Sequence, residues 1–251
     1  MKNKCILKCV LFALVAFNSL AIMAQTTQQA AKPEKKFLQP ERVRYDGSCM
    51  TIEGKDIFIY SAAFHYFRCP EELWRDRFRQ IKEAGFNTVE TYVPWNWHER
   101  IMPSGLNDNS HFDFSDVKRW LKMAQEEFGL YTIVRPGPFI CAEYSGGGYP
   151  CWLAKFCPGG MDDFWLRSAD HRHISWSQHW FDAVCKALAD EQITRKPVGE
   201  KGIILIQIEN EYNHHGCYGK EKLLKALYQS VRKSGMDIPI FTCLTRSEER
   251  R

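Results

Sequence analysis

The residues of this chain that are best suited to chemistry are three polar side chains that follow a long apolar run. Ile203–Ile208 is interrupted only by Gln207, and it ends abruptly in Glu209, Asn210 and Glu211. Such a run is typical of a strand buried on both faces of a parallel sheet. Because α/β enzymes hold reactive groups at the carboxyl ends of these strands, two carboxylates and an amide here indicate a site of enzyme chemistry. An ordinary polar loop after a strand is the plainer alternative.

The stretches around this run repeat a pattern in which a short apolar strand is followed by a helix. Strands are expected at Ile57–Ala63, Thr88–Val93, Leu130–Val134, Gly202–Ile208 and Ile238–Cys243, and helices from Pro70 to Gly85, from Ser115 to Gly129, at Trp176–Leu188 and at Leu223–Val231. A hairpin is expected in Val43–Ile52, around Asp46-Gly47. Polar and aromatic residues follow most strands, which favours an α/β fold of the (β/α)8 TIM barrel type with about the first five βα units present.

The amino-terminal residues have the pattern of an export signal. In 1–24, three lysines precede the apolar run Val10–Ala21, and Ala24 is a suitable small residue for cleavage. The run is short for a membrane span, although an uncleaved anchor is the alternative. We therefore expect a secreted or periplasmic protein without a membrane span after cleavage. A polar, flexible lead-in is expected at 25–42 and a partial barrel catalytic domain at 43–251.

Charge and cysteine content exclude some classes of partner and leave others open. The net charge is +4, and removal of the leader takes away three lysines and no acids, so nothing indicates nucleic-acid binding. Of the ten cysteines, only Cys5 and Cys9 lie in the leader. The sequence is compatible with both disulfides and free thiols. It contains no CxxC pair, so it does not indicate a structural zinc site. Asp170, His171 and His173 could share a metal, but no further ligand is evident, so no metal or other cofactor is expected.

Three long stretches resemble the catalytic domain of the glycoside hydrolase family 35 β-galactosidases. They are SAAFHYFRCPEELWRDRFRQIKEAGFNTVETYVPWNWHE (61–99), IVRPGPFICAEYSGGGYPCWL (133–153) and GIILIQIENEY (202–212), in the order and spacing of that family. The resemblance implies a retaining β-galactosidase, which removes terminal β-linked galactose from oligosaccharides, polysaccharides or glycans. Such enzymes use two carboxylates about 5–5.5 Å apart, one as general acid/base and the other as nucleophile.

The resemblance assigns the acid/base role to Glu211 and a bond with the sugar 2-hydroxyl to Asn210. Glu211 then needs a raised pKa, which nearby carboxylates such as Glu209 and Glu143 would favour. Glu209 is expected to point away from Glu211, so Glu209 is interpreted as a supporting residue or as a purely structural one.

Further sugar contacts follow from the same resemblance. Tyr92 resembles a tyrosine that bonds galactose hydroxyls, and Ile140, Cys141, Ala142 and Glu143 resemble one wall of the subsite. A core aromatic for Tyr92 and a surface ion pair for Glu143 are the alternatives. The rings of Trp95, Trp97, Tyr144 and Trp152 are more simply interpreted as core packing than as sugar platforms. Tyr144 stands where the family often has tryptophan.

The carboxyl-terminal part departs from the family pattern. The family nucleophile is a glutamate near the seventh strand, whereas this sequence reaches only the fifth, and Glu248 and Glu249 lie in the wrong context. The sequence therefore predicts a truncated β-galactosidase whose nucleophile is absent from the chain and which is inactive alone. A non-catalytic galactoside-binding remnant and another barrel glycosidase with an Asn-Glu pair remain alternatives.

Overall fold

The computed structural model describes residues 37–156, 165–212 and 220–243. The chain divides into 1–36 and Phe37–Arg251, and every described residue belongs to the second unit. The expected leader at 1–24 and most of the lead-in at 25–42 lie outside the described residues. No helix within the described ranges is long and apolar enough to cross a membrane.

A small antiparallel sheet is formed by β1 (Val43–Tyr45), β2 (Met50–Ile52) and β3 (Lys55–Ile57), in that order. Its first turn is closed by Asp46, whose Oδ1 accepts hydrogen bonds from the backbone nitrogens of Ser48 and Cys49 at 2.7 and 3.0 Å. An aspartate that bonds its own turn in this way favours reversal of the chain. The expected hairpin is therefore confirmed.

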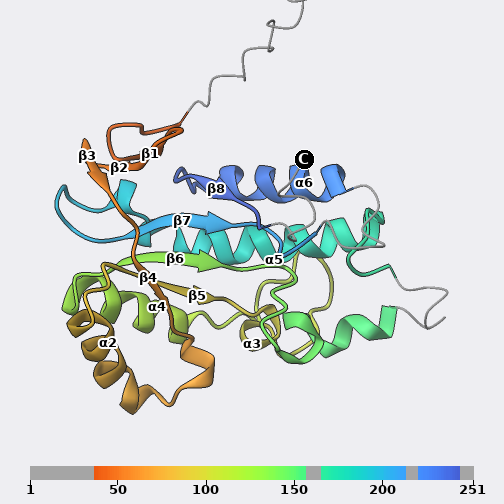
Figure 1. Cartoon of the computed structure of the whole chain (residues 1–251). Coiled ribbons are helices and arrows are strands. Elements are labelled where there is room, and N and C mark those ends of the chain that lie inside the picture. Colours follow the sequence, from red (N-terminus) through yellow and green to blue (C-terminus); the bar gives the residue numbers. More distant parts are fainter. Residues whose placement is uncertain (1–36, 157–164, 213–219, 244–251) are drawn as a thin grey trace, which may run out of the picture. The chain divides into compact units, whose positions relative to one another are not determined.

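Five parallel strands form the main sheet, and Figure 1 shows its longer strands pointing in one direction. They are β4 (Ser61–Ala63), β5 (Thr88–Tyr92), β6 (Tyr131–Arg135), β7 (Ile203–Gln207) and β8 (Ile240–Phe241), hydrogen-bonded in chain order. Parallel neighbours in chain order with helices between them are the arrangement of a (β/α) barrel. The carboxyl ends of all five strands therefore meet at one edge.

The first expected strand is wrong as a single element. Ile57 ends β3 and Ser61 begins β4, so the apolar stretch is divided between the two sheets. Asn87 holds the crossing segment, because its side chain accepts a hydrogen bond from the backbone nitrogen of Tyr60 (3.0 Å) and donates one to the carbonyl of Phe58 (2.7 Å). A local sequence pattern cannot predict this division, because the hydrogen bonds that cause it involve a residue almost thirty positions away.

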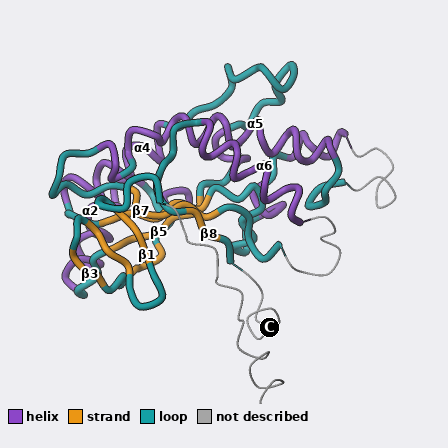
Figure 2. Tube along the Cα trace, turned by 90° about the horizontal axis from the view of Figure 1, so that it is seen from above, coloured by secondary structure: helices purple, strands orange, loops and turns teal. Residues whose placement is uncertain are grey.

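The helices of the described chain are α2 (Trp74–Glu83), α3 (Trp95–His98), α4 (Ser115–Lys122), α5 (His171–Leu188) and α6 (Lys220–Lys233). Figure 2 shows α4, α5 and α6 on one side of the strands. Short 3-10 turns occur at Tyr66–Arg68, Glu71–Leu73, Ser145–Gly148, Cys151–Phe156, Ala189–Glu191 and Ile193–Arg195, and a π-helical turn at Met123–Glu127.

The start of α5 differs from expectation because of its capping residue. α5 begins at His171 rather than Trp176, since the side chain of Asp170 accepts a hydrogen bond from the backbone nitrogen of Arg172. α4 begins at Ser115, as expected, and Asp113 accepts a hydrogen bond from the backbone nitrogen of Ser115 at 2.8 Å. Aspartate at either position satisfies a donor that the helix itself leaves unpaired.

A buried polar network joins the loop after β5 to α5. The carboxylate of Glu99 accepts hydrogen bonds from the indole nitrogen of Trp95 (2.6 Å) and from His179 (2.8 Å). Both His179 and Glu99 are almost completely buried. Trp180, on the same helix, donates to the carbonyl of Pro136 just after β6, at 2.8 Å. These bonds tie the helical layer to the strand ends where the candidate site lies.

The opposite edge of the sheet is held by residues at the start of the described chain. Arg42 donates from Nη2 to the carbonyls of Ile193 (2.6 Å) and Lys196 (3.0 Å), and it also pairs with Glu53 at 3.3 Å. Gln39 donates to Asp237 at 2.7 Å. These bonds attach the amino-terminal segment to the loops that enter β7 and β8.

Gly202 precedes β7 at a point where backbone segments pass very close to each other. A methyl group there would lie 2.6 Å from the nitrogen and 2.7 Å from the Cα of Ile193. We expect Gly202→Ala to destabilise the chain by about 1–3 kcal/mol, because the neighbouring backbone has to shift. Thermal unfolding followed by circular dichroism measures the loss. Gly47→Ala, which meets no atom within 4 Å, is the control, and equal stabilities of the two variants would contradict this packing.

Candidate active site

The three polar residues after β7 form a bend rather than a continuation of the strand. Glu209 and Glu211 both have left-handed backbones, with φ of 57° and 52°. A left-handed backbone at a residue other than glycine costs about 1 kcal/mol or more of folding free energy, so surrounding hydrogen bonds must hold the bend. Glu209 is 1% exposed and Glu211 is exposed. The two side chains therefore differ in burial. Alternation along a strand would place residues two apart on the same face, so the bend, and not alternation, accounts for the difference.

Backbone hydrogen bonds attach this bend to both neighbouring strands. The backbone nitrogen of Glu209 donates to the carbonyl of Gly137 after β6, at 2.6 Å. The backbone nitrogen of Glu211 donates to the carbonyl of Cys243 after β8, at 3.2 Å. The acidic residues are therefore positioned by the strands on either side of β7.

Asn210 is held by its side-chain oxygen. Oδ1 accepts hydrogen bonds from Arg135 Nη2 (3.1 Å), Gln207 Nε2 (3.3 Å) and Cys243 Sγ (3.1 Å). Three donors around one oxygen fix which end of the amide is which and leave its NH₂ group to donate elsewhere. No partner of that NH₂ group occurs among the described residues, and Asn210 is 5% exposed. The described residues thus fix the orientation of the amide through its oxygen alone.

Tyr92 lies beside Asn210, with Arg135 between them. The guanidinium carbon of Arg135 is 4.1 Å from the centre of the Tyr92 ring, and Arg135 Nη1 pairs with Glu90 at 3.1 Å. Burial raises the pKa of the half-buried Tyr92 hydroxyl, which therefore stays protonated at neutral pH. His65 packs at 5.3 Å from the same ring, and burial, with Arg68 and Arg135, lowers its pKa to about 4.

The loop after β6 places the predicted subsite wall in an unusual backbone conformation. Ile140 is fully buried, while Cys141 and Glu143 are exposed and Ala142 is half-buried. Cys141, Ala142 and Glu143 all have positive φ, between 46° and 54°. Arg68 donates to the carbonyl of Ala142, and the backbone nitrogen of Ile140 donates to the carbonyl of Gly147 at 2.8 Å. These bonds hold the wall against the loop after β4.

The four aromatic candidates divide into core and rim. Trp95 is fully buried and Trp152 is 7% exposed, so both belong to the core, as the plainer interpretation predicts. Trp97 and Tyr144 are half-buried. Tyr144 packs edge-to-face on Phe67, with the ring centres 5.0 Å apart. Only these two rings retain exposed surface.

Glu209 is a buried carboxylate held by Arg167. Its Oε2 accepts hydrogen bonds from Arg167 Nη2 (3.0 Å) and from the backbone nitrogen of Asn210 (2.9 Å). Burial raises the pKa of Glu209 to about 7, against the opposing attraction of Arg167. We take burial as the stronger effect because Oε1 is enclosed without a hydrogen-bond partner in the described part of the chain.

No metal centre is formed by the residues that the structure describes, which contain no group of three suitable side chains. His171 is highly exposed and pairs with Asp170 at 3.6 Å. His173 is buried and bonds the hydroxyl of Tyr149 and the carbonyl of Ser168, each at 2.8 Å. The two histidines therefore do not converge. The six cysteines that are described are all free thiols.

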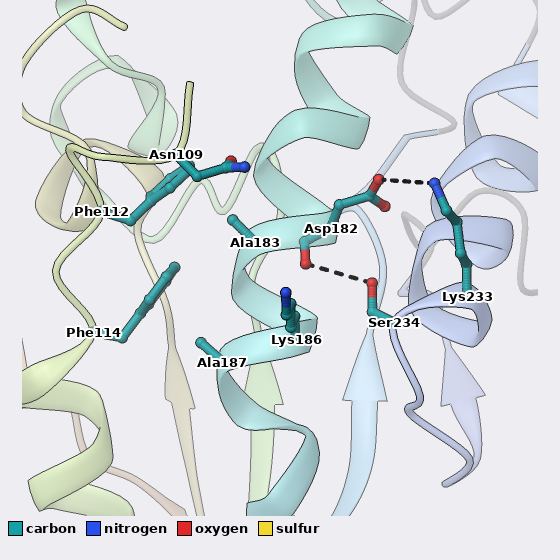
Figure 3. Close-up of a pocket in the computed structure, with 9 residues that line it drawn as sticks. All are labelled: Asn109, Phe112, Phe114, Asp182, Ala183, Lys186, Ala187, Lys233 and Ser234. Carbon is teal, nitrogen blue, oxygen red and sulfur yellow. Dashed lines mark hydrogen bonds and ion pairs between the residues drawn. The ribbon is translucent and has the colours of Figure 1, made fainter. Parts of the chain in front are cut away.

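One pocket of the structure lies away from these residues. It has a volume of about 810 Å³ and lies between α5, α6 and the loop before α4, as Figure 3 shows. Its charged groups are already partly engaged, because Lys233 pairs with Asp182 at 3.6 Å. None of the predicted site residues lines this pocket, so it is not the candidate site.

Sequence reasoning missed four residues that organise the site: Arg135, Arg167, Gln207 and Cys243. Arg135 and Gln207 end buried strands, and a polar residue at that place is a signal that could have been read. Arg167 gave no such signal, because it lies in a long loop more than forty residues before Asn210. Only the folded chain brings them together.

The raised pKa of Glu209 has a consequence for stability. Its ordinary value is 4.5, so between pH 4.5 and about 7 the folded chain holds a proton that the unfolded chain has lost. The contribution of Glu209 to the free energy of unfolding should therefore fall by roughly 3 kcal/mol across that range as pH rises. Glu209→Gln lacks this dependence. Urea unfolding at several pH values should show the wild-type stability declining relative to the variant.

The exposed Glu72→Gln is the control for this titration, and its difference from the wild type should stay nearly flat over the same range. A difference between wild type and Glu209→Gln that does not change with pH would contradict the buried, protonated carboxyl.

Residues 49–249 match the model of the glycosyl hydrolases family 35. The human "Beta-galactosidase-1-like protein 3" is 36% identical over 190 residues, covering 74% of this chain and 26% of that protein. The "Exo-beta-D-glucosaminidase" of Pyrococcus horikoshii is 40% identical over 124 residues, covering 47% of this chain and 15% of that protein. The chain thus spans about a quarter or less of these relatives.

Among solved structures, GH5_18 from Streptomyces cattleya in complex with GlcNAc has a TM-score of 0.53 at 12% identity. The matched region covers 73% of this chain and 44% of the GH5_18 chain. At 12% identity the likeness concerns the fold alone. Together with the five parallel strands, it confirms the expected α/β fold of a (β/α) barrel with about five units present. Since the family model matches most of the sequence, this chain belongs to glycoside hydrolase family 35.

Proposed function

We propose that this chain contributes the acid/base side of a retaining β-galactosidase site. Glu211 is the general acid/base, Asn210 and Tyr92 bind hydroxyls of a terminal β-galactose, and the segment Ile140–Glu143 forms one wall of the subsite. The observation that carries the proposal is the orientation of Asn210. Three donors hold its oxygen, so its NH₂ group is presented to a ligand next to the exposed Glu211.

Each proposed role follows from the chemistry of glycoside cleavage. Glu211 donates its proton to the departing glycosidic oxygen and later takes a proton from the attacking water. The amide of Asn210 donates to the 2-hydroxyl, an interaction that strengthens as positive charge develops on the sugar ring. Tyr92 is protonated and therefore able to donate to a sugar hydroxyl, with Arg135 fixing its ring.

Retaining hydrolysis needs a second carboxylate, about 5–5.5 Å from the acid/base. Two carboxylates close to Asn210 in the described chain are already engaged: the half-buried Glu90 pairs with Arg135, and the buried Glu209 pairs with Arg167. We therefore propose that these 251 residues alone do not complete the catalytic pair. Neither hydrolysis nor transfer of galactose is then expected from them.

Galactose is proposed as the sugar because of the family and the name of the human relative. A β-glucosaminide is the second candidate, because a relative named exo-β-D-glucosaminidase shares 40% identity over part of the chain. A galactoside-binding protein without catalysis is the third candidate.

We also propose export of the protein to the periplasm or the medium through residues 1–24.

The function is tested with the 251-residue chain, first shown to be folded by a cooperative thermal transition. We expect calorimetry to detect binding of galactose and an aryl β-galactoside to remain uncleaved. Asn210→Ala should weaken binding about tenfold, because a ligand hydroxyl loses its donor. Glucosamine, titrated in parallel, distinguishes the second sugar.

Turnover of the aryl galactoside by the pure chain would overturn the proposal that the catalytic pair is incomplete. Binding of glucosamine in preference to galactose would identify a β-glucosaminide, and not a β-galactoside, as the substrate. Failure of the folded chain to bind either sugar would contradict the assignment of Asn210 and Tyr92.

A further inference from the structure

We propose that Arg167, acting through Glu209, is a positioning residue that holds Asn210 and Glu211 in their working orientation. The inference rests on the proposed function, since it concerns the residues that would touch the sugar. Arg167 itself touches the backbone and the buried carboxylate behind them. Its role is therefore to set geometry.

One nitrogen of Arg167 makes both key contacts. Nη2 donates to the carbonyl oxygen of Asn210 at 2.7 Å and to Glu209 Oε2 at 3.0 Å. Arginine and a carboxylate usually form two parallel hydrogen bonds when stability is the only requirement. Here Arg167 Nε and Glu209 Oε1 are both buried without a hydrogen-bond partner in the described chain. The guanidinium is turned away from that paired arrangement so that it can reach the backbone of Asn210.

Glu209 relays the contact to the next residue. The oxygen that Arg167 contacts, Oε2, also accepts a hydrogen bond from the backbone nitrogen of Asn210, at 2.9 Å. Arg167 and Glu209 therefore engage both the N–H and the C=O of Asn210, while Arg135, Gln207 and Cys243 hold its side chain. Because Glu209 and Glu211 have left-handed backbones, the bend needs such support to persist.

Arg167 is itself held firmly in place. Its guanidinium carbon lies 3.7 Å from the centre of the Phe139 ring and 5.8 Å from that of Tyr212. Phe139 in turn packs against Gly147, where a methyl group would lie 2.1 Å from a ring carbon. The next residue, Ser168, accepts a hydrogen bond at its backbone carbonyl from His173 of α5. The loop thus carries Arg167 to Asn210 with support from α5.

A purely structural ion pair is the alternative, and Arg42 supplies the matched comparison. Arg42 Nη2 also contacts one glutamate, Glu53, and backbone carbonyls, those of Ile193 and Lys196, at the other end of the sheet. The two arginine side chains have similar exposure, 14% for Arg42 and 21% for Arg167. Arg42→Met is expected to lower stability without changing the bend after β7.

The first measurement is hydrogen exchange by mass spectrometry on the folded 251-residue chain, which does not depend on activity. In Arg167→Met, the amides of residues 209–211 should exchange about tenfold faster, because the hydrogen bonds that Arg167 donates to Asn210 and Glu209 are lost. The amides of Ile203–Gln207 should keep their protection. Arg167→Lys, which retains a charged donor, should recover part of the protection. Arg42→Met should leave residues 209–211 unchanged.

The second measurement is turnover by a polypeptide in which this chain is completed by the remaining barrel units. Arg167→Met should lower kcat/KM on aryl β-galactosides by about 10²-fold, with partial recovery in Arg167→Lys, because a small displacement of a reacting group has that effect. Arg42→Met should keep kcat/KM near the wild-type value at a temperature where it is folded.

These outcomes separate the inference from the proposed function. Unchanged exchange at residues 209–211 in Arg167→Met, or faster exchange spread evenly over the chain, would overturn the positioning role. If the completed wild type cleaves no galactoside, the proposed function fails and the exchange result still decides whether Arg167 holds the bend. If galactosides are cleaved equally by the wild type and by Arg167→Met, the positioning role is wrong and the function stands.

Discussion

The site depends most on the placement of one guanidinium group, that of Arg135, among three strands. Arg135 ends β6, pairs with Glu90 of β5, covers the ring of Tyr92 and donates to Asn210 after β7. Its side chain is only 15% exposed, and a buried cation needs well-placed partners. Nη1 and Nη2 have such partners in Glu90 and Asn210, whereas Nε has none in the described chain. The parallel sheet supplies both partners, since the carboxyl ends of its strands lie at one edge. Fold and site are therefore linked through this residue.

Backbone strain is concentrated at the same edge of the sheet. Glu209 and Glu211 after β7, and the run Cys141–Glu143 after β6, have left-handed backbones without glycine. Such conformations persist where the surrounding structure determines them. Here the support comes from buried groups: the indole of Trp180 bonds the loop after β6, and Arg167 bonds the bend after β7. At the opposite edge, Arg42 bonds the carbonyls of Ile193 and Lys196 and pairs with Glu53, which also has a left-handed backbone, with φ of 51°.

Much of the fold could be predicted from local patterns, because apolar runs and helical spacing report burial directly. The strands at Thr88 and Ile203 and the fold class followed from them. The division of Ile57–Ala63 did not, since it depends on hydrogen bonds that distant Asn87 accepts from Tyr60 and donates to Phe58. In the site, Asn210 and Glu211 were predicted from their place after a buried strand and from the family resemblance. The partners that hold them were not, because Arg167 and Cys243 meet Asn210 only in the folded chain.

The central claim is that Glu211 protonates the departing sugar oxygen, and Glu211→Gln in a completed barrel tests it most directly. Turnover should be measured on aryl β-galactosides whose phenols differ in acidity. Loss of the acid should lower kcat/KM by about 10²–10⁴-fold for a weakly acidic phenol, and very little for dinitrophenol, which leaves without a proton. Equal losses for both leaving groups, or normal rates for both, would contradict the assignment of Glu211.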